Sequence, residues 1–146
     1  MDDGAKIRGN SNLSACAAKN VKKALREAKK NGFDIDDPTS SEIVVDAAAG
    51  KKFFHFMTSK CPCITKAIGG QKGFYLLKRK RFLTVPEMGA LQGWRREWID
   101  VMLGVDGSEK KLGEAFGDGM SLNILQRLLP RALYTVGLIS DLPTDK

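Results

Sequence analysis

The strongest hydrophobic pattern of the chain lies near its C-terminal end. Between residues 122 and 136, apolar side chains recur at i, i+3, i+4 and i+7, the spacing that places them on one face of a helix. Ser121 or Asp118 can cap the first turn of this helix. Pro130 stands inside the pattern, where it has no amide donor and its ring clashes with the preceding turn. The pattern therefore predicts an amphipathic final helix that is kinked at Pro130 or split there into two shorter helices.

A second helical pattern occupies residues 14–30. Its apolar positions are few and mostly small, and they are Ala17, Val21, Ala24, Leu25 and Ala28. Ser14 can serve as the N-cap, and Asn31-Gly32 supplies a stop signal at the other end. Because the remaining face is basic, we expect this helix to lie on the surface. The preceding residues 1–13 are rich in Gly, Asn, Ser and Asp and are expected to form a flexible tail.

Three short runs between these helices have the composition of β-strands. They span 42–46, 52–57 and 73–77, and each is rich in β-branched or aromatic residues. The paired glycines Gly69-Gly70 interrupt the segment between the second and third runs. Residues 42–83 are therefore predicted to form a small, irregular β region with glycine turns.

The segment Thr84-Val-Pro-Glu87 has the pattern of a helix capping box. Its proline falls in the first turn, where the missing N–H does no harm. The helix that it opens is expected to keep an apolar face through Trp98 as far as Gly104. A polar turn is expected at 106–109 and a glycine-rich turn at 116–119, before the final helix begins.

Length and composition favour one globular domain. The chain has 146 residues, of which 42% are hydrophobic and 28% charged. We expect residues 14–146 to form this domain, with the β region at 42–83 and a helical region at 84–139. The fold class is then α+β, a small irregular β region with glycine turns, flanked by helices and ending in an amphipathic helix.

The chain also lacks the features of membrane or secreted proteins. No apolar run approaches the ~20 residues that cross a bilayer, and the first residues do not have a signal-peptide pattern. The three cysteines, Cys16, Cys61 and Cys63, are too few for a disulfide framework. We expect an intracellular protein with no membrane partner, nuclear in a eukaryote and cytoplasmic otherwise.

Positive charge is concentrated in the middle of the chain. The formal net charge is +7, and nine Lys or Arg residues lie between Ala47 and Pro86 with no acidic residue among them. Such a stretch suits a polyanion, through release of counterions from phosphates. A solvated basic face is the alternative, and charge alone leaves both open. The run from Lys78 to Arg81 could also serve as a nuclear localisation signal.

Two sequence blocks resemble the last two motifs of the DNA cytosine-5 methyltransferases. The first is Arg81-Phe-Leu-Thr-Val-Pro-Glu-Met-Gly-Ala-Leu-Gln-Gly-Trp94, similar to the family's ninth motif, R-x-L-T-x-x-E-x-x-x-L-Q-G-aromatic. The second is Phe116-Gly-Asp-Gly-Met-Ser-Leu-Asn123, similar to the tenth motif, a Gly-Asn-small turn that opens the final helix. The order of 42–46, 60–65 and 73–75 also resembles the segment before the ninth motif, so the resemblance covers about residues 20–140.

The ninth-motif resemblance implies a role in DNA recognition. In the family this block supports the target-recognition region, which implies that Arg81, Thr84, Glu87 and Gln92 organise the hinge between domains. Together with the positive charge of the run before it, the block makes Lys78, Arg79, Lys80, Arg81 and Gln92 the residues that we expect to bind DNA. The alternative is a capped helix with an adjacent surface arginine.

The tenth-motif resemblance implies one wall of a pocket for S-adenosylmethionine. The matching residues are Gly117, Asp118, Gly119, Met120 and Ser121, and all but Met120 are implied to bind the cofactor. Asp118 stands where the family usually has asparagine, and its carboxylate would repel the carboxylate of the cofactor. The alternative, a glycine turn that caps a core helix, stays open.

The catalytic motifs of the family are absent from the sequence. There is no Pro-Cys-Gln nucleophile, no Gly-x-Gly cofactor loop and no Glu-Asn-Val acid, and Ile64 follows Cys63 where glutamine would be needed. Cys61 and Cys63 with the single His55 do not supply the four ligands of a zinc site; we expect His55 to be a strand residue. No catalytic residue and no metal site are expected.

The resemblance therefore implies a partial methyltransferase fold that lacks the Rossmann-like core. It would transfer methyl from S-adenosylmethionine to cytosine C5 only with a second chain that carries the catalytic half, or it would be a truncated, inactive relic. Two alternatives remain: a non-enzymatic basic module that binds nucleic acid through residues 47–86, and a small α+β interaction domain whose charge only keeps it soluble.

Overall fold

The computed structural model describes residues 13–50, 53–71 and 73–142. Its centre is an antiparallel sheet of four short strands in the order β2-β1-β3-β4. Their bounds are β1 Ile43–Asp46, β2 Phe56–Thr58, β3 Phe74–Leu76 and β4 Arg81–Phe82. The expected tail, apart from Leu13, and the basic residues Lys51, Lys52 and Lys72 lie outside the described residues.

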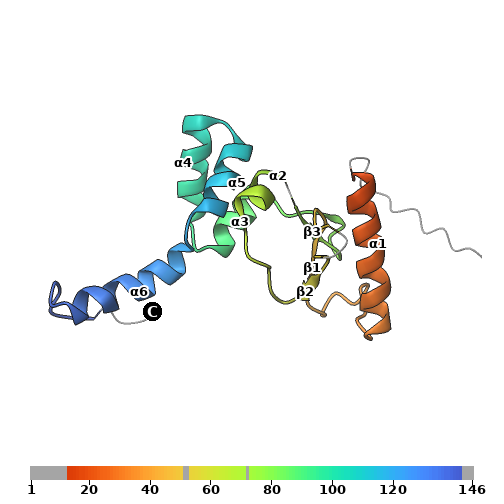
Figure 1. The fold of residues 1–146 in the computed structure, drawn as a ribbon, viewed down its shortest axis with the longest axis horizontal. Helices are drawn as coiled ribbons and strands as arrows, with labels where there is room; N and C mark the ends of the chain where they lie inside the picture. Colours follow the sequence, from red (N-terminus) through yellow and green to blue (C-terminus); the bar gives the residue numbers. More distant parts are fainter. Residues whose placement is uncertain (1–12, 51–52, 72, 143–146) are drawn as a thin grey trace, which may run out of the picture.

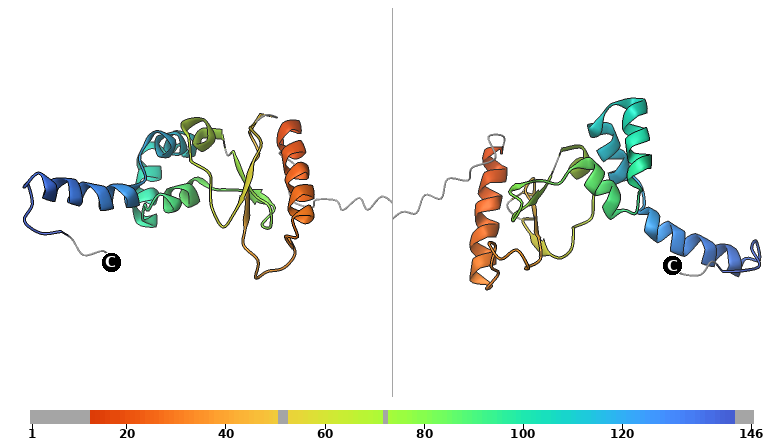
Figure 2. Two further views of the ribbon diagram at one scale, coloured as in Figure 1. Left: turned by 60° about the horizontal axis from the view of Figure 1, so that its bottom comes forward. Right: turned by 180° about the vertical axis from the view of Figure 1, so that it is seen from behind.

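Helices cover both faces of this sheet (Figure 1). The helix α1, Ala15–Lys30, lies against one face, and the other face meets a group of four helices. The bounds of that group are α2 Lys66–Gln71, α3 Val85–Leu91, α4 Arg96–Asp106 and α5 Glu109–Asp118. The last helix, α6 Leu122–Thr135, projects away from the rest of the molecule (Figure 2). The mixed α+β class expected from the sequence is confirmed.

The strand residues alternate between two separate cores. Ile43, Val45 and Tyr75 face α1, whereas Val44 and Leu76 face the four helices. The register agrees, because Val45 pairs with Tyr75 and Val44 pairs with Leu76. All four residues of β1 are buried, so this strand lies between two packed layers rather than at a wet surface.

The first helix begins and ends where the sequence indicates. The hydroxyl of Ser14 accepts a hydrogen bond from the amide of Ala17 at 3.2 Å, and Gly32 adopts a left-handed φ of 78° just beyond the last turn. The buried Asn20 side chain donates to the carbonyls of Ala47 and Ala49 at 3.1 and 2.9 Å. These two bonds fix the helix to the loop that follows β1.

Two helices stand where the sequence analysis expected glycine turns. Helix α2 contains Gly69 and helix α5 contains Gly113, and the two backbones touch: a Cβ atom on either glycine would overlap the carbonyl of the other. A Cβ atom on Gly117 would overlap the backbone of residues 65–66. The turn expected at 106–109 is confirmed, because Gly107 ends α4 with a left-handed φ of 61° and Ser108 caps the start of α5. The turn expected at 116–119 is wrong for most of its length, since α5 continues through Asp118. Glycine is a poor helix former, but here its lack of a side chain permits a close helix contact.

The helix expected from Thr84 to Gly104 is two helices. The chain leaves α3 at Leu91, turns through Gly93 at a φ of 90°, and begins α4 at Arg96. The splitting of the final helix at Pro130 is also wrong, because α6 is continuous through this residue. Its surface is solvent-exposed, so water can bond the carbonyl that Pro130 leaves unpaired.

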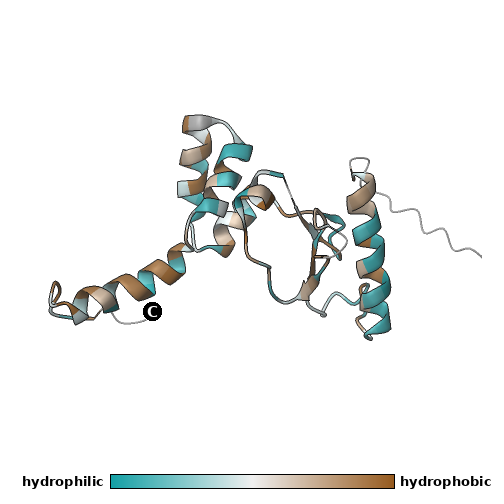
Figure 3. Cartoon of the chain, in the orientation of Figure 1, coloured by the Kyte–Doolittle hydropathy of each residue, from teal (hydrophilic) through white to brown (hydrophobic). Residues whose placement is uncertain are grey.

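None of the fourteen residues of α6 is buried. Its apolar positions include Leu128, Leu129 and Leu133, all of which are exposed, and Figure 3 shows the resulting hydrophobic colouring along the helix. Among the described helices, none combines the length and the apolar character that crossing a bilayer requires.

The contact between α2 and α5 gives a first test of the fold. We expect Gly69→Ala to lower the free energy of unfolding by about 2 kcal/mol, because the new methyl group would push against the Gly113 backbone. The matched control is Gly104→Ala in α4, where a Cβ atom would meet open space and should raise stability by about 0.5–1 kcal/mol. Urea unfolding measures both, and equal stability of the two variants would contradict the close contact.

Candidate functional site between the sheet and the helices

A bidentate ion pair joins the edge strand β4 to the start of α3. The guanidinium of Arg81 donates to both carboxylate oxygens of Glu87, at 2.7 and 2.8 Å. The same carboxylate accepts from the amide and the hydroxyl of Thr84, both at 2.9 Å, while the Thr84 hydroxyl caps the amide of Glu87. The capping box expected from the sequence is confirmed. Hydrogen bonding by Arg81 lowers the pKa of Glu87 to about 2.

The basic run before this helix also makes internal contacts. The ammonium of Lys78 donates to the carbonyl of Asp37 at 2.6 Å, to the Ser40 carbonyl and to the Ser40 hydroxyl. Arg79 lies between two carboxylates, 3.6 Å from Glu42 and 3.7 Å from Glu87. Lys80 is exposed in the β3–β4 turn, with a left-handed φ of 54°. Lys78, Arg79 and Arg81 therefore hold the turn in place, and most of their charge is compensated within the chain.

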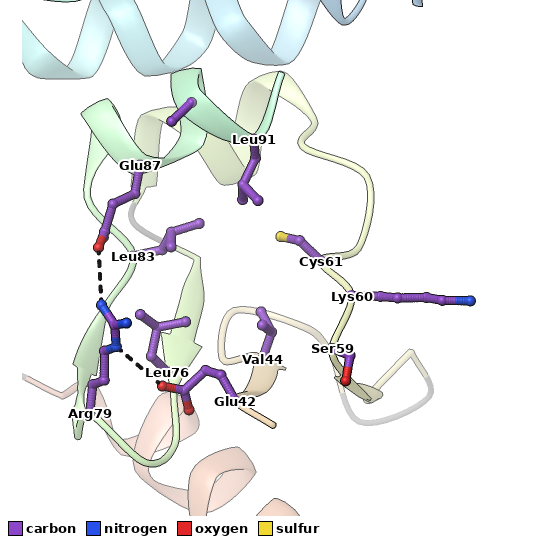
Figure 4. Close-up of a pocket in the computed structure, with 11 residues that line it drawn as sticks. Glu42, Val44, Ser59, Lys60, Cys61, Leu76, Arg79, Leu83, Glu87 and Leu91 are labelled. Atoms are coloured by element: carbon purple, nitrogen blue, oxygen red, sulfur yellow. Dashed lines mark ion pairs between the residues drawn. The ribbon is translucent and has the colours of Figure 1, made fainter. Parts of the chain in front are cut away.

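A pocket of about 470 Å³ opens beside this turn (Figure 4). Its walls are mainly apolar and include Val44, Leu76 and Leu91. Glu42, Arg79 and Glu87 stand along one side, and the segment 59–61 forms the opposite side. Figure 4 shows the Cys61 sulfur directed into the pocket and Lys60 directed away from it.

A second pocket, of about 580 Å³, adjoins the first and shares Lys60, Cys61 and Leu91 with it. Its lining brings together Gln92, Gly119 and Ser121, which come from two separate sequence blocks. The segment 60–64 forms another wall. We call the two pockets together the junction groove, defined by 59–64, Leu91, Gln92 and the linker 119–121.

Gln92 connects three helices at one end of the groove. Its side chain is only 6% exposed, and its amide nitrogen donates to the carbonyl of Phe116 in α5 at 2.7 Å. Its backbone carbonyl accepts from the amide of Asn123 in α6 at 3.2 Å. The side-chain oxygen of Gln92 is buried without a hydrogen-bond partner in the described part of the chain. Gln92 therefore joins the end of α3 to α5 and α6, whereas its expected roles in a hinge between domains and in DNA contact stay predictions.

The four residues expected to form the cofactor wall are divided between two environments. Gly117 and Asp118 belong to α5, where Gly117 packs on the backbone of 65–66 and Asp118 accepts from Lys66 at 2.8 Å. Only Gly119 and Ser121 line the groove. The expectation of one shared turn is wrong, since α5 continues through Asp118. Ser121 stands at the N-cap of α6, but its side chain makes no capping bond.

The cysteines of the groove differ in exposure. Cys61 is half-buried, and burial raises the pKa of its thiol to about 11, so it is protonated and weakly nucleophilic at neutral pH. Cys63 is exposed. His55 precedes β2 rather than lying within it, which corrects its expected place in a strand. Among the described residues, no three His, Cys, Asp or Glu side chains are grouped as metal ligands.

Sequence reasoning missed Glu42 and the segment 59–60 as parts of this site. Glu42 bonds the amide of Lys78 at 2.9 Å and approaches Arg79, so it helps to fix the basic turn. A signal for it did exist. Glu42 and Glu87 lie on either side of the acid-free stretch 47–86, where carboxylates can compensate its cations. No sequence pattern around residues 59–60 indicated that they form a pocket wall.

Comparisons of the chain with models of protein families, with curated proteins and with solved structures found no match. The resemblance of the two sequence blocks to methyltransferase motifs therefore remains a hypothesis. What the groove can do has to be inferred from its own residues.

The Arg81–Glu87 pair makes stability depend on pH. Because the folded pKa of Glu87, about 2, is below its ordinary value of 4.5, the pair stabilises the fold above pH 4.5 and loses its effect as pH falls towards 2. We expect Glu87→Gln to lower the free energy of unfolding by about 0.5–1 kcal/mol at pH 7. This difference from wild type should shrink as the pH falls from 4.5 towards 2.

The control is Glu97→Gln, which removes the same charge from the first turn of α4. Urea unfolding of wild type and both variants at pH 7 and pH 3 measures the effect. If the Arg81–Glu87 pair does not stabilise the fold, both substitutions will lower the free energy of unfolding by the same amount at both pH values.

Proposed function

We propose that the chain is the DNA-binding C-terminal part of a DNA cytosine-5 methyltransferase, which works only when a second chain supplies the cofactor-binding catalytic half. The observation that carries this proposal is the helix α6, in which no residue is buried and Leu128, Leu129 and Leu133 are exposed. Contiguous apolar surface of this kind marks an interaction site in soluble proteins. The two motif resemblances indicate the kind of partner.

The leucines of α6 lie on one side of the helix. At about 100° per residue, Leu125, Leu129 and Leu133 fall within one face, while Arg127 and Arg131 fall on the other. A helix that is apolar on one side and charged on the other normally packs against a core. In this chain α6 instead extends away from both cores (Figures 1 and 3). A Rossmann-like sheet would supply the apolar surface that this face lacks.

The junction groove continues directly to this helix. Ser121 and Ile124 line the groove, and the amide of Asn123 bonds to Gln92. A body packed on α6 would therefore stand next to the groove and close it from one side. In the proposed enzyme this chain binds DNA and forms one part of the groove, and the partner supplies the catalytic nucleophile.

The linker 119–121 suits one wall of a cofactor site, but it does not make a complete pocket for S-adenosylmethionine. Ser121 has a hydroxyl that makes no capping bond to α6, and the buried side-chain oxygen of Gln92 has no donor among the described residues. The Asp118 carboxylate is paired with Lys66 outside the groove lining, which weakens its repulsion of an anionic ligand. In the completed enzyme the cofactor would supply the methyl group, and the other walls would come from the partner.

A matched pair of substitutions in α6 tests the proposal. Leu129 is 53% exposed on the apolar face, and Tyr134 is 48% exposed away from it. We expect the isolated wild-type chain to self-associate through the apolar face, and Leu129→Lys to make it monomeric. Tyr134→Lys adds the same charge to the same helix and should leave self-association unchanged. Light scattering after size-exclusion chromatography measures these states.

The same variants are then mixed with a chain that carries Pro-Cys-Gln and the cofactor glycine motif, together with duplex DNA and labelled S-adenosylmethionine. Wild type and Tyr134→Lys should restore methyl transfer to cytosine, and Leu129→Lys should not. DNA binding without methyl transfer in any mixture would favour the basic module or an inactive relic. A wild-type chain that is monomeric and unresponsive to the partner would contradict the proposal.

A further inference from the structure

The largest group of uncompensated charge in the described structure lies on α1. Its outward face carries six cations against the single carboxylate of Glu27. All six cations are exposed, and they are Lys19, Lys22, Lys23, Arg26, Lys29 and Lys30. Both basic residues of the last turn, Lys29 and Lys30, are among them, and there a cation also interacts favourably with the helix dipole.

The arrangement of these cations is regular. At about 100° per residue, all six fall within an arc of about 120°. The arc lies opposite Ala17, Val21 and Ala24, which pack against the sheet. Along the axis they form four levels about 5 Å apart, at 19, 22–23, 26 and 29–30. The hydrogen bonds of Asn20 to the loop after β1 hold the helix against the sheet, so the positions of these charges relative to the sheet are fixed.

The charges on α1 differ from those of the basic turn in their contacts. Lys78, Arg79 and Arg81 are engaged with carbonyls or carboxylates of the chain itself. On α1, Lys23 lies 3.8 Å from Glu27 and 4.2 Å from the centre of the Phe54 ring. The other five α1 cations make no ion pair with the described residues. Uncompensated positive charge is therefore greater on α1 than on the basic turn, which the sequence had indicated as the DNA-binding segment.

The chemistry of this face fits phosphates better than a lipid surface. A helix that binds in a membrane interface inserts large apolar side chains opposite its charges. In α1 the opposite side consists of small residues that are already buried against the sheet. Only the cationic face is left for a partner, and a row of cations suits the regular negative charge of a nucleic-acid backbone.

We propose that α1 binds the phosphate backbone of duplex DNA, on the side of the sheet opposite the junction groove. The choice of DNA rests on the proposed function, whereas the choice of a phosphate backbone rests on α1 itself. Figure 1 shows α1 on one side of the sheet and the helices α2–α5 on the other. Val44 and Leu76, which line the groove, face the side away from α1, so the helix can hold DNA without filling the groove. This contact should be independent of base sequence.

The test replaces four α1 cations by glutamine, which is also a good helix former: Lys19→Gln, Lys22→Gln, Arg26→Gln and Lys29→Gln. The matched control removes four exposed cations elsewhere: Arg95→Gln, Lys110→Gln, Lys111→Gln and Arg127→Gln. Circular dichroism and thermal unfolding establish that both full-length variants fold. Fluorescence anisotropy with a 20-base-pair duplex, from 50 to 300 mM salt, then measures binding.

We expect the α1 variant to bind at least tenfold more weakly than the control at the lowest salt. Each cation that no longer neutralises a phosphate should lower the slope of log Kd against log salt by about 0.9, so four substitutions should lower it by up to about four. Affinities of the two variants within twofold of each other would overturn the proposal. Equal binding to anionic vesicles or to duplex RNA would overturn the assignment to DNA.

The α6 variant Leu129→Lys separates this proposal from the previous one. If Leu129→Lys abolishes methyl transfer but leaves duplex binding unchanged, the result concerns only the proposed role of α6 and is consistent with DNA binding by α1. Loss of duplex binding in the α1 variant, with partner binding intact by light scattering, supports the α1 contact whether or not methyl transfer occurs. An α1 variant that keeps wild-type duplex affinity overturns the α1 contact alone.

Discussion

The backbone contact between α2 and α5 is the constraint on which the rest of the structure depends. Gly69 and Gly113 approach each other so closely that neither position has room for a side chain. This contact fixes the end of the segment 59–65, because α2 begins immediately after it. The same contact sets the position of α5, whose Phe116 fills the core and bonds to Gln92. Both walls of the junction groove therefore follow from one pair of glycines.

Electrostatic compensation decides where the molecule can meet a polyanion. The basic turn is rich in charge, yet its side chains are bonded to Glu42, Glu87 and nearby carbonyls, which fixes the turn beside the groove. The outward face of α1 has no comparable set of acceptors among the described residues. A count of lysines along the sequence cannot separate these two situations, because the compensating groups come from distant segments.

Local signals predicted what local interactions determine. The N-cap Ser14, the capping box at Thr84 and Glu87 and the strand around Val44 were all predicted, since each depends on neighbouring residues. Helices α2 and α5 were missed, because their glycines resemble turns until the opposite backbone is known. For the same reason Gly117 and Asp118 were expected in a turn. The junction groove could not be predicted, since it forms where 59–64 crosses the ends of α3 and α5.

The central claim is that the sheet and helices α1–α5 form two complete cores within the chain, whereas the apolar face of α6 becomes buried only against a second chain. Native-state hydrogen exchange tests this most directly. In the isolated chain, diluted until it is monomeric, amides of β1, β3 and α5 should exchange slowly and those of α6 nearly as fast as in an unfolded chain. A chain that supplies the catalytic half should slow exchange in α6. Strong protection of α6 in a monomer without any partner would contradict the account.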